Sequence, residues 1–131
     1  MKIEEILKGC QLNSGASEEE LRDAISSVGH TLPPDYVQFL RTYNGGEGFI
    51  GENYLILWKA EELSVFNREY EVAEYAPGLF LFASSGGGTG YGFDTRDPSM
   101  PVIAVEFIGM DWSDADRVAA NFTDFLNHLA K

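Results

Sequence analysis

Residues 79–94 have the sequence LFLFASSGGGTGYGFD, and this stretch decides the fold. Residues 79–83 are all apolar and rich in aromatics, which is typical of a strand covered on both faces. Residues 84–90 predict a flexible, glycine-rich loop, and a second strand follows it. We therefore expect two joined strands, the first of them at the centre of a sheet. Three consecutive glycines, Gly86, Gly87 and Gly88, lie at the middle of this loop.

The second strand has two unlike faces. Tyr91 and Phe93 share one face, because side chains alternate along a strand, and Gly90 and Gly92 leave the other face bare. A bare face allows another backbone to approach closely.

Two further strands complete the expected sheet. Branched and aromatic residues predict strands over residues 54–57 and 101–107, and a turn at Arg96-Asp97-Pro98 precedes the second of them. An antiparallel meander is the simplest topology that joins these strands. The sequence thus predicts an α+β fold, with a mostly antiparallel sheet of about 4–6 strands and helices packed around it.

Helices are predicted before, between and after these strands. Ser17 and Glu20 form a capping box at the start of one helix, and Gly29 ends it. Pro34 suits the first turn of the next helix, which Asn44-Gly45-Gly46 ends. Apolar residues recur at helical spacing in each segment. The predicted helices cover residues 3–10, 18–28, 34–43, 59–70 and 122–129.

The composition is that of one acidic domain, residues 1–131. Its length is usual for a domain, and 44% hydrophobic residues suffice for a buried core. The chain carries 21 carboxylates against 9 Lys and Arg, a formal net charge of −12. This charge repels phosphate backbones and anionic lipid headgroups, so neither nucleic acid nor a membrane is expected as a partner. It favours a basic protein partner, although it also serves solubility. No feature specifies an oligomeric state.

The cysteine content and the N-terminus favour the cytoplasm. Cys10 is the only cysteine, so no internal disulfide can form, and it is expected on the apolar face of the first helix. Residues 1–6, MKIEEI, are acidic where a signal peptide needs a basic start. No apolar run approaches membrane-spanning length.

No reactive arrangement is evident in the sequence. The glycine loop lacks the spacing of phosphate-binding loops, which favours a structural hairpin or a recognition loop. His30, His128 and Cys10 have no partners at metal-binding spacing. Ser84 and Ser85 lack the Gly-x-Ser-x-Gly frame of a serine nucleophile. We therefore expect no catalytic residue, no metal and no cofactor.

The acidic segment 111–116, DWSDAD, superficially resembles a calcium loop but lacks the glycine and the distal glutamate of that motif. A solvated acidic turn or a partner-facing patch fits better. Within it, Trp112 is either a core residue or an interface anchor, whereas Trp58 and Tyr70 are expected to point inward.

The order of these signals resembles the SUKH superfamily, whose members include the Smi/Knr-type regulators of yeast cell-wall synthesis. Residues 32–36, LPPDY, which contain Pro33 and Tyr36, are followed by Asn44-Gly45-Gly46, as in the opening signature of that superfamily. Later elements agree in order and spacing up to residues 121–126, NFTDFL. One departure from the family pattern is the loop with Ser84, Ser85 and Thr89, where relatives often have an acidic residue.

The resemblance implies a non-catalytic α+β domain. Bacterial single-domain members are mainly regarded as immunity proteins, which bind and block a toxin that is often a nuclease. Nuclease toxins are commonly basic because they hold polyphosphate, so an acidic inhibitor suits them. The expected partner is therefore a basic toxin domain, bound in the cytoplasm. The expected charge complements are Glu47, Glu52, Asp94, Asp97, Asp111 and Asp114, with Tyr91 and Trp112 as anchors.

Two alternatives belong to other functional classes. A regulatory or scaffold module would bind an endogenous protein, or a small ligand through the glycine loop. A small hydrolase would need a nucleophile and base that the sequence does not display.

Overall fold

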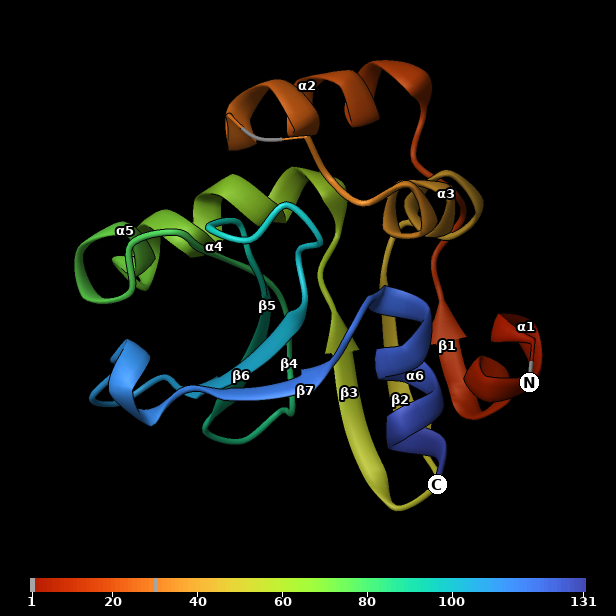
Figure 1. Ribbon diagram of the computed structural model, residues 1–131. Helices are drawn as coiled ribbons and strands as arrows, with labels where there is room; N and C mark the ends of the chain where they lie inside the picture. The colour runs from red at the N-terminus through yellow and green to blue at the C-terminus, as the bar shows by residue number, and fades with distance from the viewer. Residues whose placement is uncertain (1, 30) are drawn as a thin grey trace.

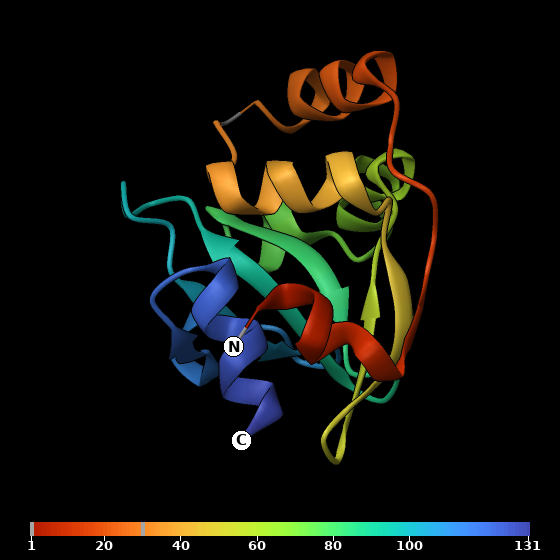
Figure 2. The same cartoon turned by 90° about the vertical axis from the view of Figure 1, so that its right-hand side faces the viewer.

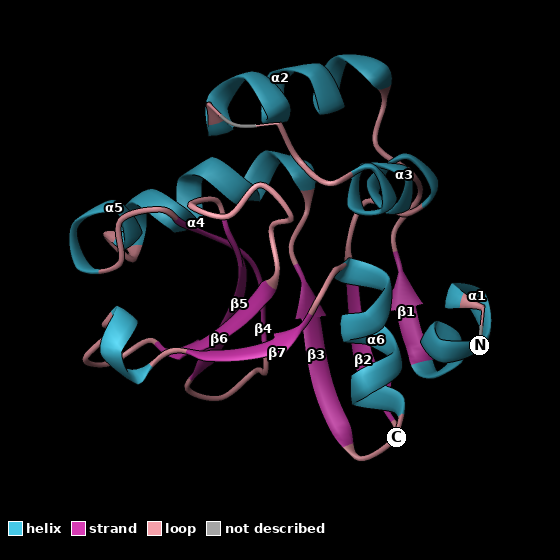
Figure 3. Cartoon of the chain, in the orientation of Figure 1, coloured by secondary structure: helices cyan, strands magenta, loops and turns pink. Residues whose placement is uncertain are grey.

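The computed structural model describes residues 2–29 and 31–131, and it contains one sheet that the chain builds in order. Each strand pairs antiparallel with the next, so the order is β1-β2-β3-β4-β5-β6-β7 (Figure 1, Figure 3). The α+β class and the antiparallel meander are confirmed, with 7 strands in place of the expected range. The strands are β1 Cys10–Leu12, β2 Gly46–Ile50, β3 Asn53–Leu57, β4 Leu79–Ser84, β5 Thr89–Asp94, β6 Val102–Glu106 and β7 Asp116–Ala119.

β4 occupies the centre of the sheet, as its apolar sequence predicts. All of its residues are buried. A bulge interrupts its pairing with β5, because Leu81 pairs with Gly92 while Ala83 pairs with Tyr91. Phe82 is the additional residue, and a bulge of this kind locally increases the bend and twist of the strand.

A helix side chain completes the hydrogen bonding of this bulge. β3 ends at Leu57 opposite Ala83, short of Leu81. Asn67, in helix α4 (Leu63–Glu69), lies where β3 would continue. Its Oδ1 accepts the Leu81 amide at 2.8 Å, and its Nδ2 donates to the Leu81 carbonyl at 2.9 Å. The Asn67 side chain thereby pairs like a strand residue and docks α4 on the sheet.

The prediction of one helix over residues 3–10 is wrong at its end. Helix α1 covers only Ile3–Ile6, a 3-10 turn follows over Leu7–Gly9, and Cys10 begins β1. So short a helix is marginal by itself, whereas β2 offers a partner strand. Gly9 allows that approach, because a Cβ there would lie 2.8 Å from the Phe49 carbonyl oxygen.

The sequence does not predict β2, because the segment GEGFI is rich in glycine. Glycine weakens the strand signal but is required at this position. A Cβ on Gly48 would lie 2.6 Å from the Cα of Cys10 in β1. β7 is not predicted either; only its first residue, Asp116, lies in the segment expected to be a solvated acidic turn or a partner-facing patch.

The helices lie around the sheet. α2 (Glu18–Val28) is the outermost and lies above α3 (Pro34–Thr42) and α4 in both views (Figure 1, Figure 2). α6 (Phe122–Ala130) contacts α1, β2 and β7. The predicted helix over residues 59–70 consists of a 3-10 turn and α4. The bounds are α2 Glu18–Val28, α3 Pro34–Thr42, α5 Val72–Tyr75 and α6 Phe122–Ala130, with 3-10 turns η1 Leu7–Gly9, η2 Ala60–Glu62 and η3 Trp112–Asp114.

One expected core residue lies at the surface. Tyr70 is 42% exposed and stacks on Phe107, with the ring centroids 4.3 Å apart. The prediction that Tyr70 points into the core is therefore wrong. Trp58 is buried, as expected.

The predicted helix ends are confirmed where local signals are strong. Ser17 Oγ accepts the Glu20 amide at 3.1 Å, and Glu20 Oε1 accepts the Ser17 amide at 2.9 Å. Gly29 ends α2 in the left-handed region with φ 76°. Pro33 is the N-cap of α3, and Pro34 is its first residue. These contacts satisfy the end groups that a helix leaves unpaired.

Asp35 of the LPPDY segment forms hydrogen bonds with two helices, α3 and α6. Asp35 Oδ1 accepts the Tyr36 amide, while Oδ2 accepts the amide and the hydroxyl of Thr123 at 3.0 and 2.9 Å. One carboxylate therefore serves the first turns of both α3 and α6, where the helix dipole favours a negative charge.

Asn44-Gly45-Gly46 does more than end a helix. α3 stops at Thr42, Gly45 is left-handed with φ 78°, and Gly46 opens β2. The buried Asn44 side chain accepts the Ala60 amide at 2.7 Å and donates to Glu61 Oε1 at 2.8 Å. Asn44 thereby caps the start of η2.

An aromatic cluster fills the space between α3, α6 and the sheet. The Tyr36 ring lies 5.3 Å from Phe82, 5.2 Å from Phe93 and 5.1 Å from Phe122. Phe125 packs edge-on against Phe82. Aromatic pairs at these separations stabilise a core beyond the area they bury.

The buried Tyr36 hydroxyl provides the first prediction. Among the described residues, no group within hydrogen-bonding distance pairs with it, and burial raises the pKa of this phenol far above its usual value. A buried polar group without a partner costs about 1–3 kcal/mol. We expect Tyr36→Phe to leave the free energy of unfolding unchanged or to raise it by about 1 kcal/mol in urea denaturation. A loss above about 1 kcal/mol would show that the hydroxyl does stabilise the fold.

Candidate partner-binding surfaces

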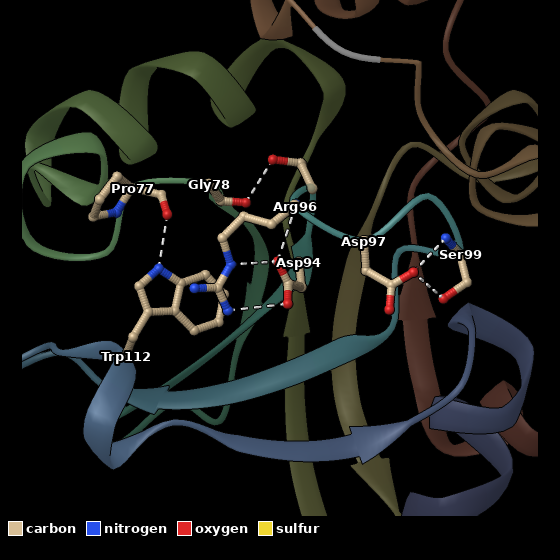
Figure 4. Close-up of polar contacts among 8 residues, drawn as sticks. Pro77, Gly78, Asp94, Arg96, Asp97, Ser99 and Trp112 are labelled. Atoms are coloured by element: carbon tan, nitrogen blue, oxygen red, sulfur yellow. Dashed lines mark hydrogen bonds and ion pairs between the residues drawn. The ribbon is translucent and has the colours of Figure 1, made fainter.

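Asp94, Arg96 and Trp112 form one cluster beside the β5–β6 turn (Figure 4). The Arg96 guanidinium donates from Nε to Asp94 Oδ1 at 2.9 Å and from Nη2 to Oδ2 at 3.2 Å. It also lies 3.4 Å from the centroid of the Trp112 ring, a cation–π contact. Trp112 Nε1 donates to the Pro77 carbonyl at 2.7 Å. The charge of Asp94 and the polar group of Trp112 are thus engaged within the chain.

Gly78 makes room for this cluster. It is left-handed with φ 93°, and a Cβ there would lie 2.5 Å from Arg96 Cγ. Its carbonyl accepts the Thr95 amide at 2.8 Å and the Thr95 hydroxyl at 2.6 Å. The Pro77-Gly78 turn and the β5–β6 turn therefore hold one another.

Three other predicted acids lie in the turns nearby. Asp97 accepts the amide and the hydroxyl of Ser99, and Asp111 accepts the amide of Ser113. These hydrogen bonds, led by the backbone amides, lower the pKa of both carboxyls below their usual values. Asp114 is exposed in η3. Asp97 and Asp111 therefore stay ionised at neutral pH while they shape their own turns.

Tyr91 is half-buried and packs against α6. Its ring lies 4.8 Å from that of Phe125. Burial, and secondarily the charge of Glu106, raises the pKa of the Tyr91 phenol. Part of Tyr91 remains accessible as an anchor, but its ring belongs largely to the core.

The β2–β3 hairpin carries the other predicted acids. Phe49 pairs with Tyr54 across the hairpin, with ring centroids 4.9 Å apart, and Phe49 is 58% exposed. The Tyr54 hydroxyl donates to the Glu47 carboxylate, and this hydrogen bond raises the pKa of the phenol. Glu52 is exposed in the turn. The hairpin thus presents an exposed aromatic ring and two exposed carboxylates.

The glycine loop is a hairpin turn whose amides are largely used within the chain. The Ser84 and Ser85 hydroxyls accept the amides of residues 86, 87 and 89 at 3.2–3.4 Å. Gly86 is left-handed with φ 81°, which favours glycine. The Thr89 hydroxyl lies 3.5 Å from the Glu106 carboxylate. An anion would have to displace these contacts beside a negative charge, so the geometry favours a structural hairpin over a phosphate site.

Sequence reasoning missed a group of acids that the helices bring together. Glu20 and Asp23 of α2 and Glu61 of η2 line one cavity of about 320 Å³. Glu71 and Glu74 line a second cavity of about 480 Å³. No local pattern reveals this group, because α2 and the segment from η2 to α5 are distant in the sequence.

Within residues 2–29 and 31–131, no three His, Cys, Asp or Glu side chains converge in a way that could hold a metal ion. Burial raises the pKa of the Cys10 thiol, which makes this lone cysteine less reactive. No helix in the same residues is long and apolar enough to span a membrane.

The comparison with protein families gives a match over most of the chain. The SMI1 / KNR4 family (SUKH-1) matches residues 15–128, which include the LPPDY segment, Asn44-Gly45-Gly46, the glycine loop and most of α6. A comparison with curated proteins gives no match. The resemblance drawn from the sequence is thereby confirmed. Because the match covers nearly the whole chain, this protein belongs to the SMI1/KNR4 family (SUKH-1).

Proposed function

We propose that this domain is a non-catalytic immunity protein that binds a basic toxin domain, of nuclease type, and neutralises it in the cytoplasm. Membership of the SUKH-1 family supports a protein-binding role. The basic character of the partner follows from charge, and a nuclease is basic because it must hold a polyanion.

One observation carries the proposal: the carboxylates of this chain are largely without cations. The formal net charge is −12, and the described residues contain two ion pairs, Arg41–Glu18 and Arg96–Asp94. The remaining acids therefore project their field into solvent. Such a field raises the rate at which a basic partner is met and disfavours acidic ones.

The proposed contact residues differ in how free they are to act. Glu47 and Glu52 are exposed in the same hairpin as Phe49; Glu52 suits a partner's cations directly, whereas Glu47 also accepts the Tyr54 hydroxyl. Three further acids, Asp97, Asp111 and Asp114, are proposed to attract the partner through their negative charge. Asp94 is balanced by Arg96 and contributes least. The proposed anchors Tyr91 and Trp112 offer only part of their rings.

Co-expression tests this function. The proposal predicts a toxin gene beside the gene for this protein; the toxin domain it encodes is expressed with and without the protein, and we expect survival only with it. The purified complex should associate at least about tenfold more slowly in 500 mM than in 50 mM salt, because salt screens electrostatic steering. Equal killing in both cultures, with no complex on gel filtration at low salt, would exclude the immunity function.

A further inference from the structure

The two helix-lined cavities are parts of one groove. α2 contacts both η2 and α4. The cavity beside η2 and the cavity beside α5 share two lining residues, Ser27 of α2 and Ser64 of α4. We call this continuous depression the α2–α4 groove. Its parts have volumes of about 320 and 480 Å³, within the range of ligand pockets in proteins.

The floor of the α2–α4 groove is apolar. Ala24 and Ala60 lie under one end. Val72, Leu79 and Phe80 lie under the other end, and all five residues are buried against the core. Each of the five residues is 7% exposed or less, so covering them removes little apolar area from water, and the floor serves as an apolar surface against which a partner's side chains can pack.

The rim of the groove is acidic. Its carboxylates are Glu20, Asp23 and Glu61 at one end and Glu71 and Glu74 at the other, with Arg68 as the cation among the residues that line it. Glu71 stands there in a left-handed conformation, φ 54° and ψ 41°, which turns the chain from α4 into α5. The rim therefore attracts cations at both ends of the groove.

We propose that the α2–α4 groove binds a basic amphipathic helix of the partner protein. Its apolar side chains enter between α2 and α4, and its Lys and Arg side chains meet the acids of the rim. This is the helix-in-groove mode of recognition, in which packing gives affinity and the flanking charges give orientation. The inference rests on the proposed function and names its docking surface.

A plug variant and a matched control test the groove. Ser27→Trp fills the junction of the two cavities, whereas Ser26→Trp places the same side chain on α2 outside both. Ser27 and Ser26 are exposed, so both variants should fold, and a thermal melt checks this. The probe is a synthetic helical peptide with Leu on one face and Lys and Arg on the other, compared with a scrambled peptide of equal composition.

We expect the helical peptide to bind in fluorescence anisotropy and to shift the amide NMR signals of Ser27 and Ser64. Ser27→Trp should raise the Kd of the helical peptide at least about tenfold, and Ser26→Trp should raise it less than about twofold. Equal Kd values for the two variants would overturn the inference. Shifts centred on the Phe49 hairpin would overturn it as well, and so would equal binding of the scrambled peptide.

Charge reversal gives a second test that does not depend on filling the groove. Asp23→Lys with Glu74→Lys changes two rim residues, whereas Glu19→Lys with Glu69→Lys changes two exposed acids outside it, and each pair raises the net charge from −12 to −8. The rim pair should weaken binding about tenfold more than the control pair. Equal weakening would mean that net charge alone attracts the peptide.

The two proposals fail in different ways. If Ser27→Trp still protects cells from the toxin, the groove is not the docking surface and the immunity function stands. If the toxin kills equally with and without the protein, yet the peptide binds in the groove, the immunity function fails and the groove stands.

Discussion

Replacing Asn67 by alanine is expected to lower the free energy of unfolding by about 2–6 kcal/mol, since two buried backbone groups lose their partners at about 1–3 kcal/mol each. The Asn67 amide accepts from the Leu81 N–H and donates to the Leu81 carbonyl, and Leu81 is fully buried in the central strand. It also donates to the Leu63 carbonyl at 2.8 Å. The loss is a large share of the 5–15 kcal/mol that stabilises a typical domain.

Asn127 is the matched control for this substitution. It too lies in a helix and is half-buried, but its amide donates only to the Thr123 carbonyl one turn earlier, at 3.1 Å. Asn127→Ala should therefore cost less than about 1 kcal/mol. Urea denaturation of both variants, with unchanged m-values, measures the difference. Similar losses at the two sites would show that the bulge does not depend on α4.

Replacing Asn44 by alanine is expected to cost about 2–3 kcal/mol, because it leaves the buried Ala60 amide without its partner and removes a hydrogen bond to a charged group. Asn44 Oδ1 accepts that amide at 2.7 Å, and Nδ2 donates to Glu61 at 2.8 Å. The second bond counts for less, since Glu61 is exposed and water can replace Asn44. The substitution should also loosen η2, which carries one rim acid of the α2–α4 groove.

Asn13 provides the comparison for Asn44. Its Nδ2 donates to the Asn44 carbonyl at 3.0 Å, but Asn13 is exposed, so Asn13→Ala should cost less than about 1 kcal/mol. Hydrogen exchange of the Ala60 amide gives an independent measure, and it should speed up only in Asn44→Ala. An Ala60 amide that stays protected in Asn44→Ala would contradict the capping role.

The candidate surfaces were only partly predictable. Glu47, Glu52 and Asp114 are exposed acids; Glu52 lies in a turn and Asp114 in η3, whereas Glu47 lies in β2, a strand that the sequence did not predict. The engagement of Asp94 by Arg96 and of Trp112 by Pro77 was not predicted. The Trp112–Pro77 contact joins residues 35 positions apart, and neither residue carries a local signal for the other. The groove acids of α2 and of the segment from η2 to α5 carry no sequence signal for one another, because their common location depends on how these segments pack.

The elements that the sequence determined by itself depend on contacts within a few residues. The capping box joins Ser17 to Glu20, Gly29 is needed for its own backbone conformation, and the run 79–83 is apolar enough to seek the core in any arrangement. The net charge of −12 likewise needs no fold. These features follow from short-range sterics, hydrogen bonding and hydrophobicity.

Tertiary structure alone decided the features whose partners are distant. Cys10 lies in β1 and not in the first helix because it pairs with β2. Asn44 caps a turn that begins 16 residues later in the sequence. Asn67 pairs with Leu81 14 residues on, and Asp35 serves a helix 88 residues on. Such side chains meet several possible partners of similar energy in the unfolded chain. Only the packing of helices on the sheet selects one of them, because burial makes an unpaired polar group costly.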